Sequence, residues 1–181
     1  ITYRQLARDA EAEAALRRGI AMGESNQTNV SQTINLASRY EADGRYEDAL
    51  AVLGGIGPTI TQYGLAAWRT VKSCALAKTG KRSAALAEFA QLRKLGANYP
   101  SGLLEAQICL EDYDAAADTL VHGLKDPKRI PQMLLLLSEF DSLPANRPLS
   151  TLDLGLDKLR QRPEVAAAIA AAGGTRRFRV V

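Results

Sequence analysis

The sequence is poor in the residues that most often carry chemistry. Its 181 residues include one histidine, two cysteines and one tryptophan, and aromatic residues make up only 6%. A metal site needs several ligands at suitable spacing, and the single histidine, His122, has no such neighbours in the sequence. We therefore predict no catalytic residues, no metal site and no cofactor, in a protein that is not an enzyme.

Long hydrophobic runs are also missing. The run from Met133 to Leu137, for example, is far shorter than the roughly 18 apolar residues that cross a membrane, so we predict no membrane partner. The net charge is +3, but the basic residues are scattered and interleaved with acids, with 176–179 as the main exception. A nucleic-acid-binding protein usually gathers its basic residues on one helix or stripe. This pattern favours a mixed, solvated surface and no direct nucleic-acid partner.

Two cysteines are too few for a small disulfide scaffold, which carries more of them at regular spacing. Cys74 and Cys109 both lie in helical patterns, so we predict two buried thiols in a reducing compartment and a cytoplasmic protein. An enzyme that uses these cysteines is a less favoured alternative. The chain lacks an initiator methionine and a signal-peptide pattern, which predicts a fragment or a processed form.

Abundant alanine and leucine predict closely packed helices and an all-α fold. Apolar residues recur at helical spacing, and glycine or proline separates the runs. The last residues, 175–181, are predicted to be extended. The predicted helices are residues 1–22 (helical at least from Arg4), 30–42, 46–53, 62–78, 82–95, 101–110, 114–124, 130–140, 151–161 and 163–172.

An internal repeat runs through the first two thirds of the chain. A large residue is followed nine positions later by alanine and four positions after that by another large residue. The alanines are Ala12, Ala49, Ala85 and Ala116, at intervals close to 34 residues. Small residues of this kind let two antiparallel helices approach closely. The complete sets are Tyr3/Ala12/Leu16, Tyr40/Ala49/Leu53 and Leu76/Ala85/Phe89, and Gln107/Ala116/Leu120 departs at its first position.

Residues 36–56 are the best-preserved unit, and their turn, Gly44-Arg45-Tyr46-Glu47-Asp48-Ala49-Leu50, resembles that of the tetratricopeptide repeat (TPR) family. The resemblance covers residues 1–125, as about four degenerate repeats of which the first is truncated. It implies an α-α superhelix, a TPR-like solenoid of antiparallel helix hairpins. Residues 126–181 are predicted to form C-terminal capping helices and an extended basic tail, packed on the same domain. A helical bundle without true repeats is the alternative.

The resemblance also implies a function, since TPR hairpins bind a peptide or a partner helix on the inner side of their first helices. We therefore expect a non-catalytic protein-protein interaction module, with a homodimer left open. The alternative is a regulatory or sensing region of a larger bacterial signalling or transcriptional protein whose output domain lies upstream. A carboxylate clamp is not expected, because only Asn35 matches one. The expected concave-face residues are Ser31, Asn35, Ser38, Glu41, Thr70, Cys74, Lys78 and Glu105, with Ala67, Asn98 and Ser101 beside them.

Overall fold

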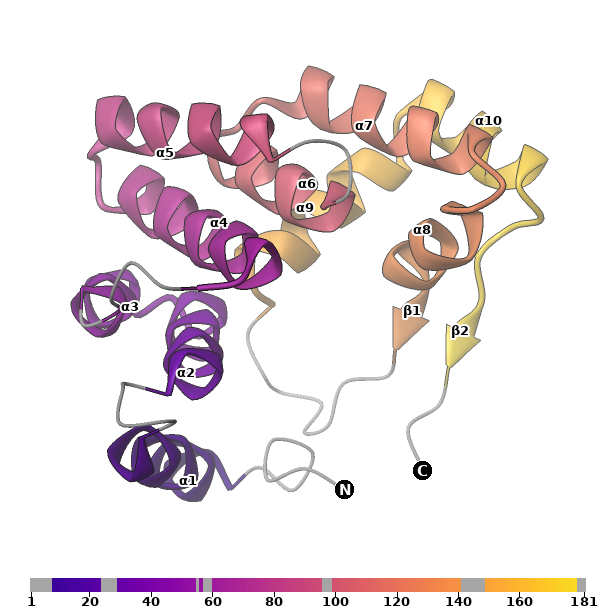
Figure 1. Ribbon diagram of the computed structural model, residues 1–181. Coiled ribbons are helices and arrows are strands. Elements are labelled where there is room, and N and C mark those ends of the chain that lie inside the picture. The colour runs from indigo at the N-terminus through magenta and orange to yellow at the C-terminus, as the bar shows by residue number, and fades with distance from the viewer. Residues whose placement is uncertain are drawn as a thin grey trace.

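The computed structural model describes residues 8–23, 29–54, 56, 60–95, 99–140 and 149–178. In these ranges the fold is helical, which confirms the all-α prediction, and one short pair of strands is added (Figure 1). No helix in them is long and apolar enough to cross a membrane. The elements are α1 (Asp9–Met22), α2 (Val30–Ala42), α3 (Tyr46–Leu53), α4 (Gln62–Lys78), α5 (Arg82–Lys94), α6 (Pro100–Cys109), α7 (Tyr113–Lys125), α8 (Ile130–Leu137), β1 (Glu139–Phe140), α9 (Thr151–Arg160), α10 (Pro163–Ala171) and β2 (Arg177–Phe178).

Helices α2 to α7 pair as three successive hairpins: α2 with α3, α4 with α5, and α6 with α7. Their first helices also pack side by side, α2 against α4 and α4 against α6 (Figure 1). The alanine of each hairpin, Ala49, Ala85 or Ala116, is completely buried. This is the packing that the spacing predicts, since an alanine leaves room for the neighbouring helix to come close.

The same turn joins the two helices of each hairpin. In the first, Gly44 has a φ of 75° and the N–H of Arg45 donates to the carbonyl of Tyr40 at 2.7 Å. Gly80 takes this place in the second hairpin, with a φ of 77°. In the third hairpin Glu111 adopts the left-handed conformation, with a φ of 63°. The third turn lacks the glycine of the other two and still has the same backbone geometry. Glycine is the residue that adopts this geometry at the lowest cost.

Helix α1 is attached to the first hairpin by a polar network as well as by apolar contacts. The Glu13 carboxylate accepts hydrogen bonds from the Tyr40 hydroxyl at 2.7 Å and from Arg17 Nε at 3.0 Å. Arg45 Nη1 lies 2.9 Å from its other oxygen. The bond from Tyr40, with those from the two arginines, lowers the pKa of Glu13 to about 2 against the cost of its burial. Leu16 adds an apolar contact to the core around Tyr40.

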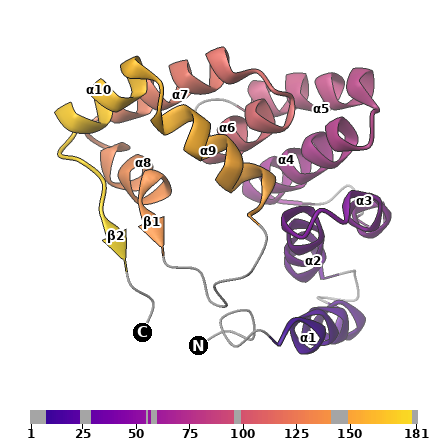
Figure 2. The same cartoon turned by 180° about the vertical axis from the view of Figure 1, so that it is seen from behind.

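The C-terminal helices share a core with the third hairpin. Met133 of α8, Leu156 of α9 and Val165 of α10 join Leu120 of α7 in one buried cluster. Helix α8 packs on α7, and α9 turns back and packs against α6 (Figure 2). At its start, Thr151 shares a hydrogen bond of 2.8 Å with Tyr46 of α3, 105 residues earlier in the chain. The C-terminal segment thus reaches the first hairpin as well as the last.

Two details differ from the sequence prediction at this end. The helix predicted for 130–140 ends at Leu137, and the next residues form β1, which pairs in parallel with β2. Ser138 links the end of α8 to the strands, since its hydroxyl donates to the Leu134 carbonyl at 2.7 Å and accepts from the Arg176 N–H at 3.2 Å.

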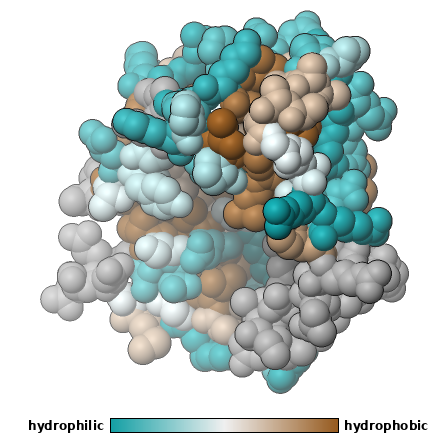
Figure 3. Space-filling view, turned by 90° about the vertical axis from the view of Figure 1, so that its right-hand side faces the viewer, coloured by the Kyte–Doolittle hydropathy of each residue, from teal (hydrophilic) through white to brown (hydrophobic). Residues whose placement is uncertain are grey.

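Hydrophobic residues form a surface patch between hydrophilic ones on the side of the molecule that carries α8 and α10 (Figure 3). The predictions for residues 1–7 and 179–181 lie outside the described residues.

Candidate functional site

A cavity of about 380 Å³ lies where the first helices of the three hairpins meet α9. Glu41 of α2, Thr70 of α4, Glu105 of α6 and Asp153 of α9 all line it. Figure 2 shows α9 from the side on which it runs past α6 toward α4 and α2. The space between the first helices is therefore closed on one side by a helix from the far end of the chain.

Half of the predicted concave-face residues line this cavity. They are Ser38, Glu41, Thr70 and Glu105, together with the neighbouring Ala67 and Ser101. Ser31 and Asn35 are exposed nearer the start of α2 and do not line it. Lys78 is half-buried at the end of α4 and pairs with Glu111 at 3.2 Å. Asn98 lies outside the described residues.

The prediction of two thiols is wrong, because Cys74 and Cys109 form a disulfide. Both are buried, as predicted, at 0% and 2% exposure. Their Cα atoms are 5.0 Å apart, which is within the usual range for a disulfide. Helices α4 and α6 come this close because Gly102 has no side chain: a Cβ there would lie 2.5 Å from Thr70 Oγ1. Cys74 therefore crosslinks two helices and does not present its side chain to a partner.

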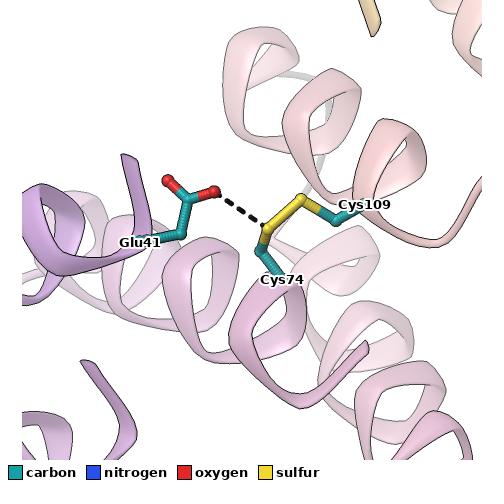
Figure 4. A group of neighbouring side chains, drawn as sticks. All are labelled: Glu41, Cys74 and Cys109. Atoms are coloured by element: carbon teal, nitrogen blue, oxygen red, sulfur yellow. Dashed lines mark hydrogen bonds between the residues drawn. A yellow bond between two sulfur atoms is a disulfide. The ribbon is translucent and has the colours of Figure 1, made fainter. Parts of the chain in front are cut away.

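Glu41 lies beside this disulfide and has no ordinary hydrogen-bond partner. Its side chain is directed at the disulfide, with Oε1 3.0 Å from Cys74 Sγ (Figure 4). A disulfide sulfur carries no hydrogen, so any proton shared between these atoms must come from the carboxyl. Burial raises the pKa of Glu41 to about 7; the charge of Asp153 adds to this rise and that of Lys78 opposes it. A buried carboxyl without donors favours its neutral form.

Glu105 of α6 is a second carboxyl without a donor within the described ranges, although the residue is only partly buried. Burial raises its pKa to about 8, and the neighbouring Glu41 contributes to the rise. In the part of the chain that the structure describes, neither carboxyl accepts a hydrogen bond from an N–H or O–H group. Asp153 differs, because the backbone N–H of Ser150 donates to it at 3.0 Å and the Ser150 hydroxyl at 2.7 Å. Among the described residues, the cavity thus contains one carboxyl that accepts hydrogen bonds and two carboxyls that lack donors.

Glu41, Cys74 and Cys109 could in principle hold a metal, since their ligand atoms lie within 4.8 Å of one another. A cysteine binds zinc through its thiolate, and the sulfurs here are bonded to each other. The group therefore does not fit a metal while the disulfide is intact. Reduction would free two thiols beside one carboxyl, which is one ligand short of the usual tetrahedral site.

Two aromatic rings stand at the cavity, and the sequence prediction missed both. Tyr63 of α4 is 74% exposed, and Tyr99 precedes α6. Their ring centroids are 6.0 Å apart and the rings are tilted by 53°. Both line the cavity, as does Asp153, which the sequence indicated only as a helix-capping residue. The repeat pattern could have placed Tyr63 on α4, but it gives no sign that α9 returns.

No family model, curated protein or solved structure was found to match this chain.

Proposed function

We propose that this chain is a non-catalytic interaction module, a short TPR-like array that binds an extended peptide or a partner helix between its first helices. The observation that carries the proposal is the cavity, lined by α2, α4 and α6 together. Side chains at equivalent places of consecutive hairpins, such as Thr70 and Glu105, line one continuous space there. The TPR-like solenoid is part of this proposal and is supported by the three buried alanines and the repeated turn geometry.

A sensing role is the second candidate, as a regulatory region of a larger bacterial signalling or transcriptional protein. The observation that favours it is the closure by α9, because a cavity of about 380 Å³ is also of a size that encloses a small ligand. The predicted cytoplasmic location stays a prediction. The disulfide argues against it, since disulfides are rare in cytosolic proteins.

The peptide-binding proposal can be tested by selecting peptides from a random library on the intact chain. Ala67→Trp places an indole in the cavity that Ala67 lines, and Ala87→Trp places the same group on the exposed side of α5. We expect the selected peptides to bind the Ala87→Trp variant as tightly as the original protein and the Ala67→Trp variant at least tenfold more weakly. Circular dichroism checks that both variants are folded.

Failure to select any peptide, or equal binding to both variants, would contradict the proposed peptide groove. Selection of a small molecule that saturates the cavity, in place of any peptide, would favour the sensing role.

A further inference from the structure

The charge of the cavity is one-sided. Its lining contains the carboxyls of Glu41, Glu105 and Asp153, and among the described lining residues there is no lysine or arginine. Lys78 is an opposing charge that acts on Glu41 from the end of α4, and it is itself paired with Glu111 at 3.2 Å. A ligand that brings positive charge would therefore meet three acidic groups and no competing base.

Glu41 is independent evidence for a ligand, because its buried carboxyl lacks a hydrogen-bond donor in the described part of the chain. It is only 5% exposed and lines the cavity, and its Oε1 lies 3.0 Å from Cys74 Sγ, a disulfide sulfur that cannot donate. Burying a charged carboxyl without a partner is costly. A group that supplied N–H donors from inside the cavity would remove this cost. Glu105 lines the same cavity and also lacks a hydrogen-bond donor among the described residues.

The size of the cavity and its aromatic lining limit which ligands it can hold. A volume of about 380 Å³ is at the lower end of the range for ligand pockets, so it suits one extended side chain and not a folded segment. Tyr63 and Tyr99, with centroids 6.0 Å apart, provide two aromatic faces beside it. Aromatic faces attract organic cations, whereas a hydrated metal ion gains little from them.

We propose that this cavity binds the ammonium or guanidinium group of a lysine or arginine side chain from a partner peptide, held by Glu41 and Glu105 and flanked by the two tyrosines. This rests on the proposed function, because it identifies the side chain that the bound peptide places in the groove. The rest of the peptide lies outside the cavity, along the exposed parts of the first helices.

Binding of a cation has a measurable consequence for protons. A nearby positive charge favours the ionised carboxyls and lowers their pKa values from about 7 and about 8. A complex formed at pH 7 therefore releases protons, and affinity rises from pH 6 to pH 9 by up to about tenfold per pH unit for each proton released. Among the described residues, Asp153 and Lys78 are charged groups that act on Glu41, and the titratable Tyr63 and Tyr99 also line the cavity.

The probe is Nα-acetyl-lysine methylamide, with the norleucine analogue as a control that has almost the same length and no charge. Binding to the intact, oxidised chain is followed by NMR titration at pH 6 and pH 9. We expect the lysine probe to bind at least tenfold more tightly than the norleucine probe at pH 9, and the difference to shrink at pH 6. Calorimetry in two buffers of different ionisation enthalpy should show proton release.

Variants test the assignment of the two carboxyls. Glu41→Gln combined with Glu105→Gln should weaken the lysine probe at least tenfold and remove its pH dependence. Glu47→Gln is the matched control, because Glu47 is exposed on α3 and does not line the cavity. The pH dependence of the original protein tests the proposal even where the double variant does not fold.

Equal binding of the lysine and norleucine probes, or unchanged binding by the folded double variant, would overturn the cation site. Peptides selected on the chain could still bind the groove in that case, so the proposed function would survive. Spermidine tests whether the ligand is a free polyamine. If spermidine saturates the cavity while the lysine probe does not, the assignment to a peptide side chain is wrong.

Discussion

Removing the disulfide should destabilise the protein by an amount that follows from its position in the chain. Cys74 and Cys109 are 35 residues apart in sequence. Closing a loop of this length lowers the entropy of the unfolded chain and stabilises the fold by about 4 kcal/mol at 25 °C in the loop-entropy model. Both side chains are buried, so replacement by alanine adds a small cavity term. The perturbation we consider is Cys74→Ala with Cys109→Ala.

The free energy of unfolding is measured by guanidinium titration, with the original protein in its oxidised and reduced forms for comparison. We expect the double variant and the reduced protein to lose a similar amount, about 4 kcal/mol. The slope of the free energy with denaturant should increase, because an unfolded chain without the crosslink exposes more surface. Native circular dichroism should not change.

Two outcomes would refute this reasoning. If the original protein, unfolded without reductant, reacts with a thiol reagent at both Cys74 and Cys109, the disulfide is not present. If the bond is present but the double variant unfolds at the same denaturant concentration as the oxidised protein, the crosslink does not restrict the unfolded chain as the loop length implies.

Three further changes test other parts of the structure. Burial raises the pKa of Glu41 from 4.5 to about 7, so its protonated form favours the folded state. This contribution to the free energy of unfolding is fully present below pH 4.5 and is lost as pH rises through 7. Urea titrations from pH 5 to pH 9 should therefore show a decline that Glu41→Gln reduces by up to about 3 kcal/mol. Gly155→Ala would place a Cβ 2.2 Å from Ile108 Cγ2, so we expect a loss of about 1–3 kcal/mol in chemical unfolding, whereas Gly64→Ala, with 3.4 Å to its nearest neighbour, should cost little. Ser150→Ala removes the capping box of α9 and should cost about 1 kcal/mol, seen as a lower melting temperature; an unchanged melting temperature would contradict this role.

The helices themselves could be predicted closely, because their ends are set by local chemistry. The predicted range 30–42 matches α2 at both ends. Asn29 begins it by accepting a hydrogen bond from the Gln32 N–H at 3.1 Å, and Gly44 follows its end with a positive φ. Ser150 caps α9 in the same way. Such signals act over three or four residues, so a sequence displays them directly.

Contacts between distant segments were not predictable from the same signals. The pairing of β1 with β2 joins Glu139 to Arg177, and two-residue strands have no periodicity to detect. The disulfide needs Cys74 and Cys109 on touching faces of α4 and α6, which depends on the close approach at Gly102. Spacing alone shows that the two cysteines are one repeat apart, and this is equally consistent with separate thiols.

The candidate site was predictable in part for the same reason. Repeat positions identified Ser38, Glu41, Thr70 and Glu105, all of which line the cavity. Ser31 and Asn35, which were predicted on the same face of α2, do not line this cavity. The residues that α9 contributes lie outside the repeat, so no periodicity within the hairpins could have brought Asp153 to this place.

The position of α9 also decides what the groove can accept. At Gly155 this helix approaches α6 so closely that a Cβ would overlap Ile108, and Tyr46 binds its first residue, Thr151. A partner helix lying along all three first helices would have to displace α9 and the core formed by Leu156 and its neighbours. That displacement would expose apolar surface to water, at a free-energy cost of about 25 cal/mol per Å² exposed. An extended peptide that inserts one long side chain between α2, α4, α6 and α9 needs no such displacement, so of the two proposed ligands the structure favours the extended peptide over the helix.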